Sequence, residues 1–558
     1  MKKTSILLII SLITVKVMAQ NTNVLPNRLD FAQRTYSQIL AIPTPQKGST
    51  CYDTDNNCLR IYDGSTWRCT TSAASAGFND ATGVCSGATC VTTSGSPVGS
   101  FVVFKESTSY NNEIYEVGYG QYGNLMYGFN FGAGSFYTGT GGNVGFVAKH
   151  DANGTNLWAT GIAPNPSNGS YFTVNSTVNS IKVNATGVYI IGTFSGALAV
   201  GTPNTTTLTS AGGSDIFVIK MDAATGAFIW AKQFGGAGND SGIDLTFGEN
   251  SSYLYFTGYD NGMSVGYCVP STGSQKIFIG KLDTSTGASI GNGAAIVEPI
   301  AHSERINSIL FYDNKVLLVG SFVGSIYAAY VAAGCSAILS GTTLVGTTGR
   351  EVFILSYDTG LMPTSYKMAY AGNDAADDLG PLKATLENGF SGGYYASKLK
   401  ICGNPVGTFP LGNRTVNAGG YIMTLNLNFS VLPTINEVIT LQGGTFTGFG
   451  DGYAVGICPS ASGIINGSIN IGCSAGQNFM LSTNNAGLFN WVINSIMIIG
   501  SSGGLGTQST TVVSKLCNKV YAFGTYTNGI RLCNSTLDAT NKKYGFWWQY
   551  NECGGSCN

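Results

Sequence analysis

The sequence predicts a protein built almost entirely from β-strands. Glycine supplies 77 of the 558 residues, and tight turns between short strands favour glycine. Tyrosine and phenylalanine contribute 29 and 28 residues, and both favour the half-buried surface of a sheet. No long segment carries apolar residues at the i, i+3, i+4 and i+7 positions of an amphipathic helix. In addition, one sequence pattern returns several times along the chain.

The pattern is clearest in GSDIFVIKMDAATGAFIW, from Gly213 to Trp230. Its first landmark is an apolar residue in a β-like run: Phe146, Phe217, Phe278, Phe353, Ile422, Phe479 and Phe546. The second is a glycine three residues after an aromatic or aliphatic residue: Gly128, Gly192, Gly258, Gly320, Gly393, Gly467 and Gly524. The members are roughly 57 to 75 residues apart, which suits a four-stranded blade with long loops. The sequence therefore predicts a seven-bladed β-propeller.

Each repeat reads as four strands, and the last strand often contains tryptophan. Trp158, Trp230 and Trp491 follow the apolar landmark by 12 or 13 residues. They could stack on sugars, but we interpret them as packing between neighbouring blades, because one blade alone cannot bury both of its faces. The last repeat has only three strands. We expect GSFVVFKES, from Gly99 to Ser107, to complete that blade and close the ring.

The repeat DIFVIKMDAATGAFIWAKQFGGAGND, followed by YLYFTG, resembles that of secreted bacterial seven-bladed β-propellers of the SBBP-repeat type. The resemblance covers roughly residues 99–558 and is weakest around Ile422. It implies the propeller fold and an exported location. It implies no catalytic residues.

The region before the repeats divides into three parts. Residues 1–19 have two lysines, a short apolar run and Val-Met-Ala, which is the layout of a secretory signal peptide. Residues 20–70 form a small β module, in which STCYD and LRIYD pair and Trp67 covers one face. This module resembles one at the front of surface proteins of Bacteroidetes-like bacteria. Residues 71–98 are a linker rich in Ser, Gly, Ala and Thr, and the propeller occupies residues 99–558.

The 14 cysteines of an exported chain are more simply interpreted as disulfides than as zinc ligands. The candidates lie close together in pairs: Cys85 with Cys90, Cys458 with Cys473, Cys517 with Cys533, and Cys553 with Cys557. A further set follows the recurring glycine, in the predicted second loops: Cys268, Cys335, Cys402, Cys473 and Cys533. No metal site is predicted from these cysteines.

The predicted loops give the propeller one plain face and one face with long loops. Loops after the second strand are long and those after the fourth strand vary in length, and binding residues gather on such loops. We therefore expect ligand contacts from the acidic residues placed on this face: Asp240, Asp244, Asp374, Asp377, Asp378 and Asp451. A Ca²⁺ site is one alternative, and turn formation by Asp beside glycine is the simpler one. No cofactor is predicted.

The composition and the motifs narrow the range of functions expected for this chain. Only 10% of residues are charged and the net charge is −1, which argues against nucleic-acid binding. No later segment is apolar enough to span a bilayer as a helix. The two histidines lie in no catalytic motif, so we expect no enzyme. We expect an extracellular or cell-surface binding or adhesion protein for a glycan or protein ligand. The alternative is an accessory subunit of a secretion or motility machine in the cell envelope, with a periplasmic location possible.

Overall fold

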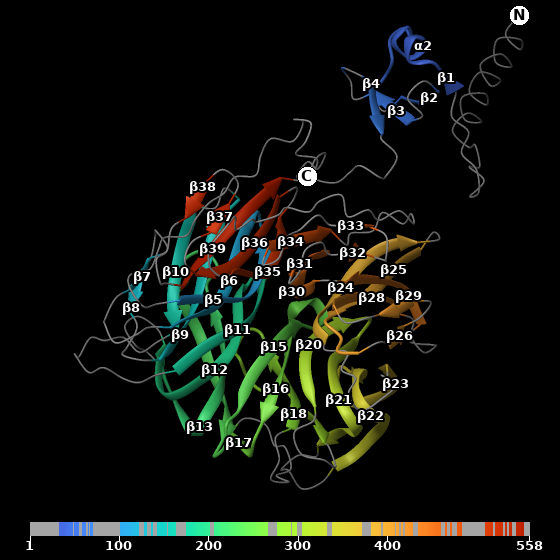
Figure 1. Cartoon of the computed structure of the whole chain (residues 1–558). Coiled ribbons are helices and arrows are strands. Elements are labelled where there is room, and N and C mark those ends of the chain that lie inside the picture. Colours follow the sequence, from blue (N-terminus) through green and yellow to red (C-terminus); the bar gives the residue numbers. More distant parts are fainter. Residues whose placement is uncertain are drawn as a thin grey trace, which may run out of the picture. The chain divides into compact units, whose positions relative to one another are not determined.

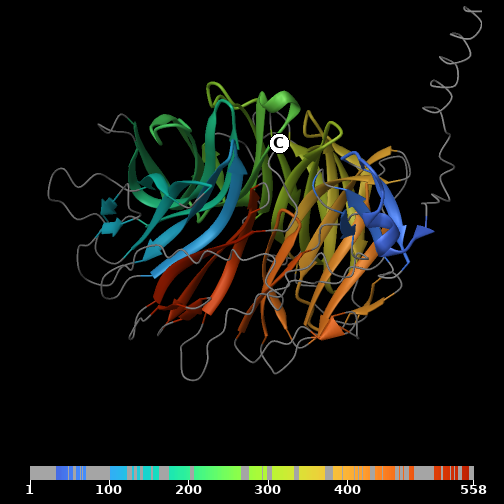
Figure 2. The ribbon, with the colours of Figure 1, turned by 90° about the horizontal axis from the view of Figure 1, so that it is seen from above.

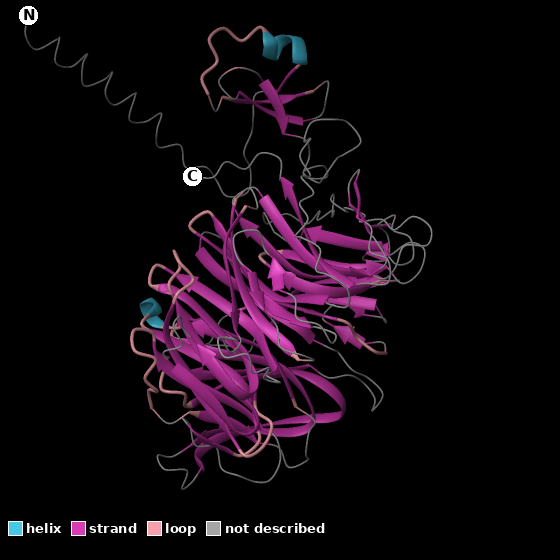
Figure 3. Cartoon of the chain, turned by 90° about the vertical axis from the view of Figure 1, so that its left-hand side faces the viewer, coloured by secondary structure: helices cyan, strands magenta, loops and turns pink. Residues whose placement is uncertain are grey.

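The computed structural model divides the chain into two compact units, residues 1–76 and 77–558. It describes residues 33–70 and 101–551, apart from residues 48, 55–57, 63–64, 66, 122–127, 131–134, 138–141, 153–154, 163–174, 201–205, 266–275, 292, 298–303, 332–337, 371–380, 392–393, 408, 412–413, 417–418, 428–433, 443, 459–463, 466–468, 471–476, 483–507, 517–518, 528–529, 533–534 and 538–542. Strands dominate both units (Figure 3).

The smaller unit contains one four-stranded sheet and one short helix. Its strands follow the order β1-β2-β3-β4: β1 (Gln33–Arg34), β2 (Thr50–Asp53), β3 (Cys58–Tyr62) and β4 (Trp67–Thr70). The predicted hairpin is present as β2 and β3, and Trp67 is buried beside Ile39 and Cys51. Helix α2 (Tyr36–Leu40) was not predicted. It begins at a capping box, in which Thr35 and Gln38 satisfy each other's backbone N–H groups.

The larger unit is a β-propeller whose described strands form six main sheets. The first three sheets are β10-β9-β6-β5, then β11-β12-β13-β14-β17, and then an eight-stranded sheet with β15, β16, β18, β19, β21, β22 and β23 in order and β20 beside β21. Their bounds are β5 (Phe101–Tyr110), β6 (Glu113–Gln121), β9 (Asn143–Asp151), β10 (Asn156–Ile162), β11 (Asn175–Asn184), β12 (Gly187–Val200), β13 (Thr206–Met221), β14 (Phe228–Gly236), β15 (Ser241–Phe247), β16 (Tyr253–Asp260), β17 (Met263–Val265), β18 (Lys276–Asp283), β19 (Ala294–Val297), β20 (Arg305–Tyr312), β21 (Lys315–Val331), β22 (Ile338–Asp358) and β23 (Pro363–Tyr370).

The last three sheets are β24-β25-β28-β29-β32-β33, β30-β31-β34 and β35-β36-β39. Their bounds are β24 (Pro381–Ser391), β25 (Tyr394–Gly403), β28 (Gly419–Asn426), β29 (Thr434–Gln442), β30 (Thr445–Gly450), β31 (Tyr453–Cys458), β32 (Ile464–Ile465), β33 (Ile469–Asn470), β34 (Gln477–Ser482), β35 (Gln508–Leu516), β36 (Lys519–Thr527) and β39 (Lys543–Asn551). Smaller elements are the 3-10 helix η1 (Glu249–Ser251) and the hairpins of β7 (Gly128–Asn130) with β8 (Ser135–Tyr137), β26 (Phe409–Leu411) with β27 (Arg414–Val416), and β37 (Ile530–Leu532) with β38 (Ser535–Leu537).

The all-β propeller prediction is confirmed, but the prediction of seven blades is wrong, because the described strands form six. Two of the predicted repeats share the eight-stranded sheet, where β19 pairs with β21 along Ala294–Val297. That pairing uses the extension of β21 beyond its Gly320 landmark. A long hairpin of the later repeat thus joins the sheet of the earlier one, and the period of the sequence does not show this.

The register of the sheets explains the recurring landmarks. In each repeat the apolar residue of the third strand lies opposite one position of the second strand. The pairs are Gly118–Phe146, Gly192–Phe217, Gly258–Phe278, Gly320–Phe353, Cys402–Ile422, Gly456–Phe479 and Gly524–Phe546. Three predicted glycine landmarks are therefore wrong. Gly118, Cys402 and Gly456 occupy the positions that the sequence assigned to Gly128, Gly393 and Gly467.

Close approach of the first strand and the facing aromatic ring requires a glycine at this position. A Cβ on Gly192 would lie 1.9 Å from the Thr177 carbonyl oxygen and 2.4 Å from the ring of Phe217, which no side chain tolerates. The fifth repeat solves the same packing differently. There, Cys402 replaces glycine and the smaller Ile422 replaces phenylalanine.

The ring is closed by side-chain packing rather than by the predicted strand exchange. Strand β5 pairs with β6 in its own sheet, and the last sheet is β35-β36-β39. The expectation that residues 99–107 complete the last blade is therefore wrong. Phe104 of β5 instead packs against Phe523 of β36, with ring centroids 5.4 Å apart. Figures 1 and 2 show the blue first strand beside the red strands of the last sheet.

Neighbouring repeats are also joined where the turn after a third strand meets the sheet before it. We call this contact the turn latch: donors from one repeat converge on a backbone carbonyl in the next. The Thr284 carbonyl accepts hydrogen bonds from the Tyr189 hydroxyl at 3.1 Å, Lys220 Nζ at 3.1 Å and Trp230 Nε1 at 3.3 Å. The Ala223 carbonyl likewise accepts from Lys149 and Trp158. This confirms the packing role predicted for Trp158 and Trp230, whereas Trp491 lies outside the described residues.

Candidate functional site

The candidate site is built by the first strand of every repeat: β5, β11, β15, β20, β24, β30 and β35. All seven contribute residues to one pocket of about 330 Å³. Each of these strands has a β-bulge at an equivalent place, where the register to the second strand shifts by one residue. The shifts lie at Phe104/Glu106, Val178/Ser180, Gly242/Asp244, Ile306/Ser308, Pro381/Lys383, Phe446/Gly448 and Thr510/Val512. A bulge re-aims the side chains that follow it.

In three repeats the residue after the bulge accepts a hydrogen bond from a backbone N–H of the next repeat. Glu106 accepts from the Ile181 N–H at 2.9 Å, and Asp244 accepts from the Ile309 N–H at 3.0 Å. Ser308 makes the equivalent contact, its Oγ accepting from the Ala384 N–H at 2.9 Å. In the sixth repeat this position is Gly448, which has no side chain to continue the series.

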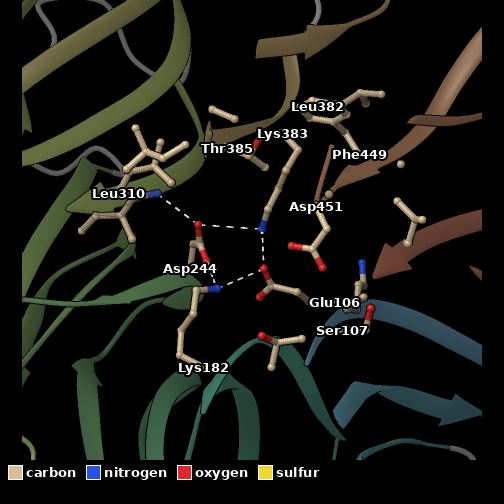
Figure 4. Close-up of a pocket in the computed structure, with 18 of the residues that line it drawn as sticks. Glu106, Ser107, Lys182, Asp244, Leu310, Leu382, Lys383, Thr385, Phe449 and Asp451 are labelled. Carbon is tan, nitrogen blue, oxygen red and sulfur yellow. Dashed lines mark hydrogen bonds and ion pairs between the residues drawn. The ribbon is translucent and has the colours of Figure 1, made fainter. Parts of the chain in front are cut away.

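Four charged side chains from four repeats meet in this pocket (Figure 4). Lys383 Nζ lies 2.9 Å from Glu106 Oε1 and 3.9 Å from Asp244 Oδ2. Lys182 Nζ lies 3.1 Å from Glu106 Oε1 and 3.9 Å from Asp244 Oδ1. The Ser180 hydroxyl lies within hydrogen-bond distance of both carboxylates, with its Oγ 2.6 Å from Asp244 Oδ1, so they share its single proton. We call the four charged residues, Glu106, Lys182, Asp244 and Lys383, the axial network. Its two carboxylates balance its two ammonium groups, so the network links the first strands of four repeats and carries no net charge of its own.

The pKa values of Glu106 and Lys383 follow from burial opposed by charge pairing. Burial alone would raise the pKa of Glu106, but Lys182, Lys383 and the Ser180 hydroxyl outweigh burial and lower this pKa to about 2. For Lys383, burial would lower the pKa, whereas Asp244 and Glu106 raise it above the ordinary lysine value. Both groups therefore stay ionised over the whole neutral range.

One further cation of the pocket is not part of the network. Lys105 is the bulged residue of β5, and among the described residues no carboxylate forms an ion pair with it. Its ammonium lies 5.7 Å from the ring centroid of Tyr119. Lys105 is accessible to solvent, yet the pocket wall around its side chain displaces enough water to lower the pKa of the ammonium group by desolvation. The pocket also has apolar lining, from Leu310, Leu382, Leu386 and Phe449.

The structure separates the acidic residues that the sequence placed on one face. Asp244 belongs to the axial network, inside the pocket. Asp240 is fully buried at the start of β15, where its two oxygens accept backbone N–H groups of Gly236 and Asn261 at 2.8 and 2.6 Å. Asp451 lines the pocket from the turn between β30 and β31. That turn is at the opposite end of a first strand from Asp240, so the two do not share a face. Asp374, Asp377 and Asp378 lie outside the described residues.

Sequence reasoning missed most of the pocket. Glu106, Lys105, Lys182 and Lys383 were not singled out, because isolated charges in strand-like runs resemble solvent-facing positions. A signal was nevertheless present. Glu106, Ser180 and Ser308 each precede the true glycine of their repeat by twelve residues. A polar residue at the same offset in the inner strands of three repeats indicates a shared polar axis.

Almost all of the cysteines predicted to form disulfides lie outside the described residues. Cys85, Cys90, Cys473, Cys517, Cys533, Cys553 and Cys557 lie outside the described residues, as do Cys268 and Cys335. Of Cys458 only the backbone is described, at the end of β31. Cys402 is described, and its placement in a second loop is wrong. It lies within β25 as a free, fully buried thiol, whose pKa burial raises.

In the described part of the chain, no group of three or more His, Cys, Asp or Glu side chains could hold a metal ion. Over the same residues, neither length nor apolar character allows any helix to cross a bilayer.

Comparison with known proteins gives structural likeness only. No protein-family model matches the chain, and no curated protein matches it. The resemblance to SBBP repeats therefore stays a prediction. Among solved structures, the dihydro-heme d1 dehydrogenase NirN in complex with DHE is 10% identical over 73% of this chain and 72% of its own, with a TM-score of 0.31. The parainfluenza virus 5 hemagglutinin-neuraminidase ectodomain is 10% identical over 84% and 85%, with a TM-score of 0.30.

Two other matches have different printed functions. Quinohemoprotein alcohol dehydrogenase from Comamonas testosteroni is 10% identical over 82% of this chain and 76% of its own, with a TM-score of 0.29. Drosophila Plexin A in complex with Semaphorin 1b is 7% identical over 70% and 86%, with a TM-score of 0.25. The sequence led us to expect that the chain is no enzyme. That expectation is contradicted, because three of these four similar structures are named as enzymes. Likeness at this level transfers neither an activity nor a ligand.

Proposed function

We propose that this chain is an exported recognition protein whose propeller binds the carboxylate of an acidic glycan or acidic protein segment in the central pocket. The observation that carries the proposal is Lys105. It is the lysine of the pocket that no described carboxylate neutralises, while Lys182 and Lys383 are each held by two.

The environment of Lys105 favours an anionic ligand. Desolvation lowers its pKa, so the ammonium gains from any negative charge brought to it. Lys182 and Lys383 are held by Glu106 and Asp244, so they compete little for the same ligand. The pocket volume of about 330 Å³ is at the small end of ligand sites, which suits one sugar ring or one side chain. Leu382 and Phe449 offer apolar contact to the uncharged part of such a group.

A binding experiment with paired probes tests the carboxylate. Oligogalacturonate and its methyl ester form one pair, and a glutamate-rich peptide and its glutamine counterpart form the other. We expect the full chain to bind one acidic probe and to bind its neutral partner at least tenfold more weakly, since hydrogen bonds to charged groups contribute about 1.5–3 kcal/mol. The pair that shows this difference identifies the source of the carboxylate.

A matched pair of variants tests the residue. Lys105→Met should weaken binding of the acidic probe about tenfold or more. Lys232→Met is the control, because Lys232 lies on β14, the fourth strand of its repeat and outside the pocket. Equal binding of acidic and neutral probes, or equal effects of the two variants, would contradict the proposal.

The alternative, an accessory subunit of an envelope machine, has one observation in its favour. The smaller unit has a sheet and a core of its own around Ile39, Cys51 and Trp67, so it can serve as a separate docking module. Cross-linking of the tagged chain in its native envelope, followed by mass spectrometry, tests this. A stoichiometric partner linked to residues 33–70 supports the alternative, and a chain recovered alone excludes it.

A further inference from the structure

A second, uncharged groove lies at the other end of the first strands. Its volume is about 480 Å³, and its lining comes from the first, second and third repeats: Asn143, Asn175, Thr177, Thr193, Phe194, Ser195, Gly213, Ser214 and Asn239. These residues lie where first and third strands begin and second strands end. This is the face for which the sequence predicts long loops. None of the lining residues is charged, in contrast to the central pocket.

Two asparagines of the groove occupy equivalent positions and make the same contact. Asn175 and Asn239 each stand four residues before the bulged residue of their first strand. Asn175 Oδ1 accepts from the backbone N–H of Asn143 at 2.7 Å, and Asn239 Oδ1 accepts from that of Ser214 at 3.1 Å. The neighbouring Gly213 permits this approach, since a Cβ there would lie 2.1 Å from Asn239 Oδ1.

These contacts fix which polar groups remain for a ligand. A backbone N–H can only donate, so the oxygen of each asparagine must face it, and the Nδ2 group is left as a donor. No described residue accepts a hydrogen bond from Nδ2 of Asn175 or Asn239 in the structure. Asn143 Oδ1 is buried and has no hydrogen-bond partner among the described residues. A buried acceptor of this kind is costly unless something donates to it.

Hydroxyl groups complete the groove. Asn175 pairs across the ladder with Ser195, and Thr177 pairs with Thr193, so these four side chains lie on one face of the sheet. Thr193 Oγ1 is 2.9 Å from Ser241 Oγ, while the Thr177 hydroxyl makes no described hydrogen bond. Phe194 is 1% exposed and packs on Phe217, so it offers little surface for stacking.

We infer that this groove binds a neutral carbohydrate. Amide donors, an unpaired amide acceptor and threonine and serine hydroxyls match the alternating donors and acceptors of a sugar. The lack of charge in the lining gives no advantage to a carboxylate or an ammonium. The inference does not depend on the acidic ligand of the central pocket, because it uses other residues and the opposite end of the first strands.

Ligand-observed NMR and calorimetry on the full chain test this with methyl glycosides of glucose, galactose, mannose and N-acetylglucosamine. We expect one of them to bind with a dissociation constant of about 0.1–10 mM, as suits a small site without stacking. Thr177→Val keeps the shape of the side chain, removes only a hydroxyl that makes no described internal bond, and should weaken binding about threefold to tenfold.

Asn239→Asp is the second variant, since its carboxylate still accepts from the Ser214 N–H but has lost the amide donor. We expect binding to fall about tenfold. Asn184→Asp is the matched control, because Asn184 Oδ1 also accepts a backbone N–H, from Thr186 at 2.8 Å, at the far end of β11. Binding of no glycoside at 50 mM (about five times the weakest expected constant), or unchanged binding in both groove variants, would overturn the inference. Lys105→Met should leave sugar binding unchanged, which separates this test from that of the central pocket.

Discussion

The axial network and the turn latches both join neighbouring repeats, but they do so by opposite means. The network concentrates four charges from β5, β11, β15 and β24 in one pocket. In each latch, two or three hydrogen-bond donors share one backbone carbonyl. The Thr284 carbonyl, for example, accepts from Tyr189, Lys220 and Trp230. The difference indicates which of the two contacts is more sensitive to the loss of a single side chain. Loss of one ion leaves its partners buried with unbalanced charge, whereas loss of one latch donor leaves the carbonyl still bonded.

The largest effect is expected from breaking the network at its most connected member. Glu106→Gln should lower the free energy of unfolding by about 3 kcal/mol, because Lys182 and Lys383 then share one carboxylate. Urea denaturation followed by tryptophan fluorescence measures this. The double variant Glu106→Gln with Lys383→Met should lose less than the sum of the single variants. A loss below about 0.5 kcal/mol for the single variant would show that the network does not hold the strands.

Acid should weaken the network without any substitution. The pKa of Glu106 is lowered to about 2, against about 4.3 for an unfolded chain. The unfolded state therefore binds the proton first as the pH falls. The stability from Glu106 is complete above about pH 5 and declines between pH 4.3 and 2, by about 3 kcal/mol in total. Denaturation midpoints from pH 7 to 2 measure the decline, and Glu106→Gln should remove that share of it.

The latch should respond less to a comparable loss. Trp230→Phe removes the donor to the Thr284 carbonyl and part of the packing on Tyr189, whose ring centroid is 6.0 Å away. We expect a loss of about 1–2 kcal/mol in the free energy of unfolding. Trp158→Phe should behave alike, because Trp158 makes the same contact with the Ala223 carbonyl. A loss as large as that of Glu106→Gln would erase the proposed contrast.

The smallest effect is expected when only a hydroxyl of a latch is removed. Tyr189→Phe keeps the ring and leaves Lys220 and Trp230 on the Thr284 carbonyl. We expect a change of about 0.5 kcal/mol. A thermal or urea midpoint shifted as far as for Trp230→Phe would mean that the three donors act as a unit, not as separate contributions.

The sequence contained enough to predict the fold class, because in six of the seven repeats a glycine of the second strand faces a phenylalanine of the third strand. Gly192, Gly258, Gly320 and Gly524 were found for that reason. Two of the three wrong landmarks, Gly128 and Gly467, are glycines close in sequence to the true ones, and the third, Gly393, falls in the repeat where Cys402 takes the place of glycine. Spacing along the chain also gives no information on which strands of adjacent repeats pair, so the shared eight-stranded sheet could not be foreseen.

The candidate site was largely outside the reach of the sequence argument. Asp244 was found, but it was grouped with Asp240 and Asp451 through their shared setting beside glycine-rich segments. The structure shows that one bulge per first strand decides which side chains face the pocket, and a bulge has no sequence signature of its own. Lys182 and Lys383 become partners of Glu106 only when strands 76 and 277 residues apart come together.

Closure without strand exchange has a consequence for how such a chain can change over generations. The first and last sheets meet through side chains such as Phe104 and Phe523, and each keeps its own strands. A gene segment encoding one repeat could therefore be duplicated or lost without leaving a strand unpaired at this junction. At this seam the two ends of the propeller share side-chain packing and no backbone ladder.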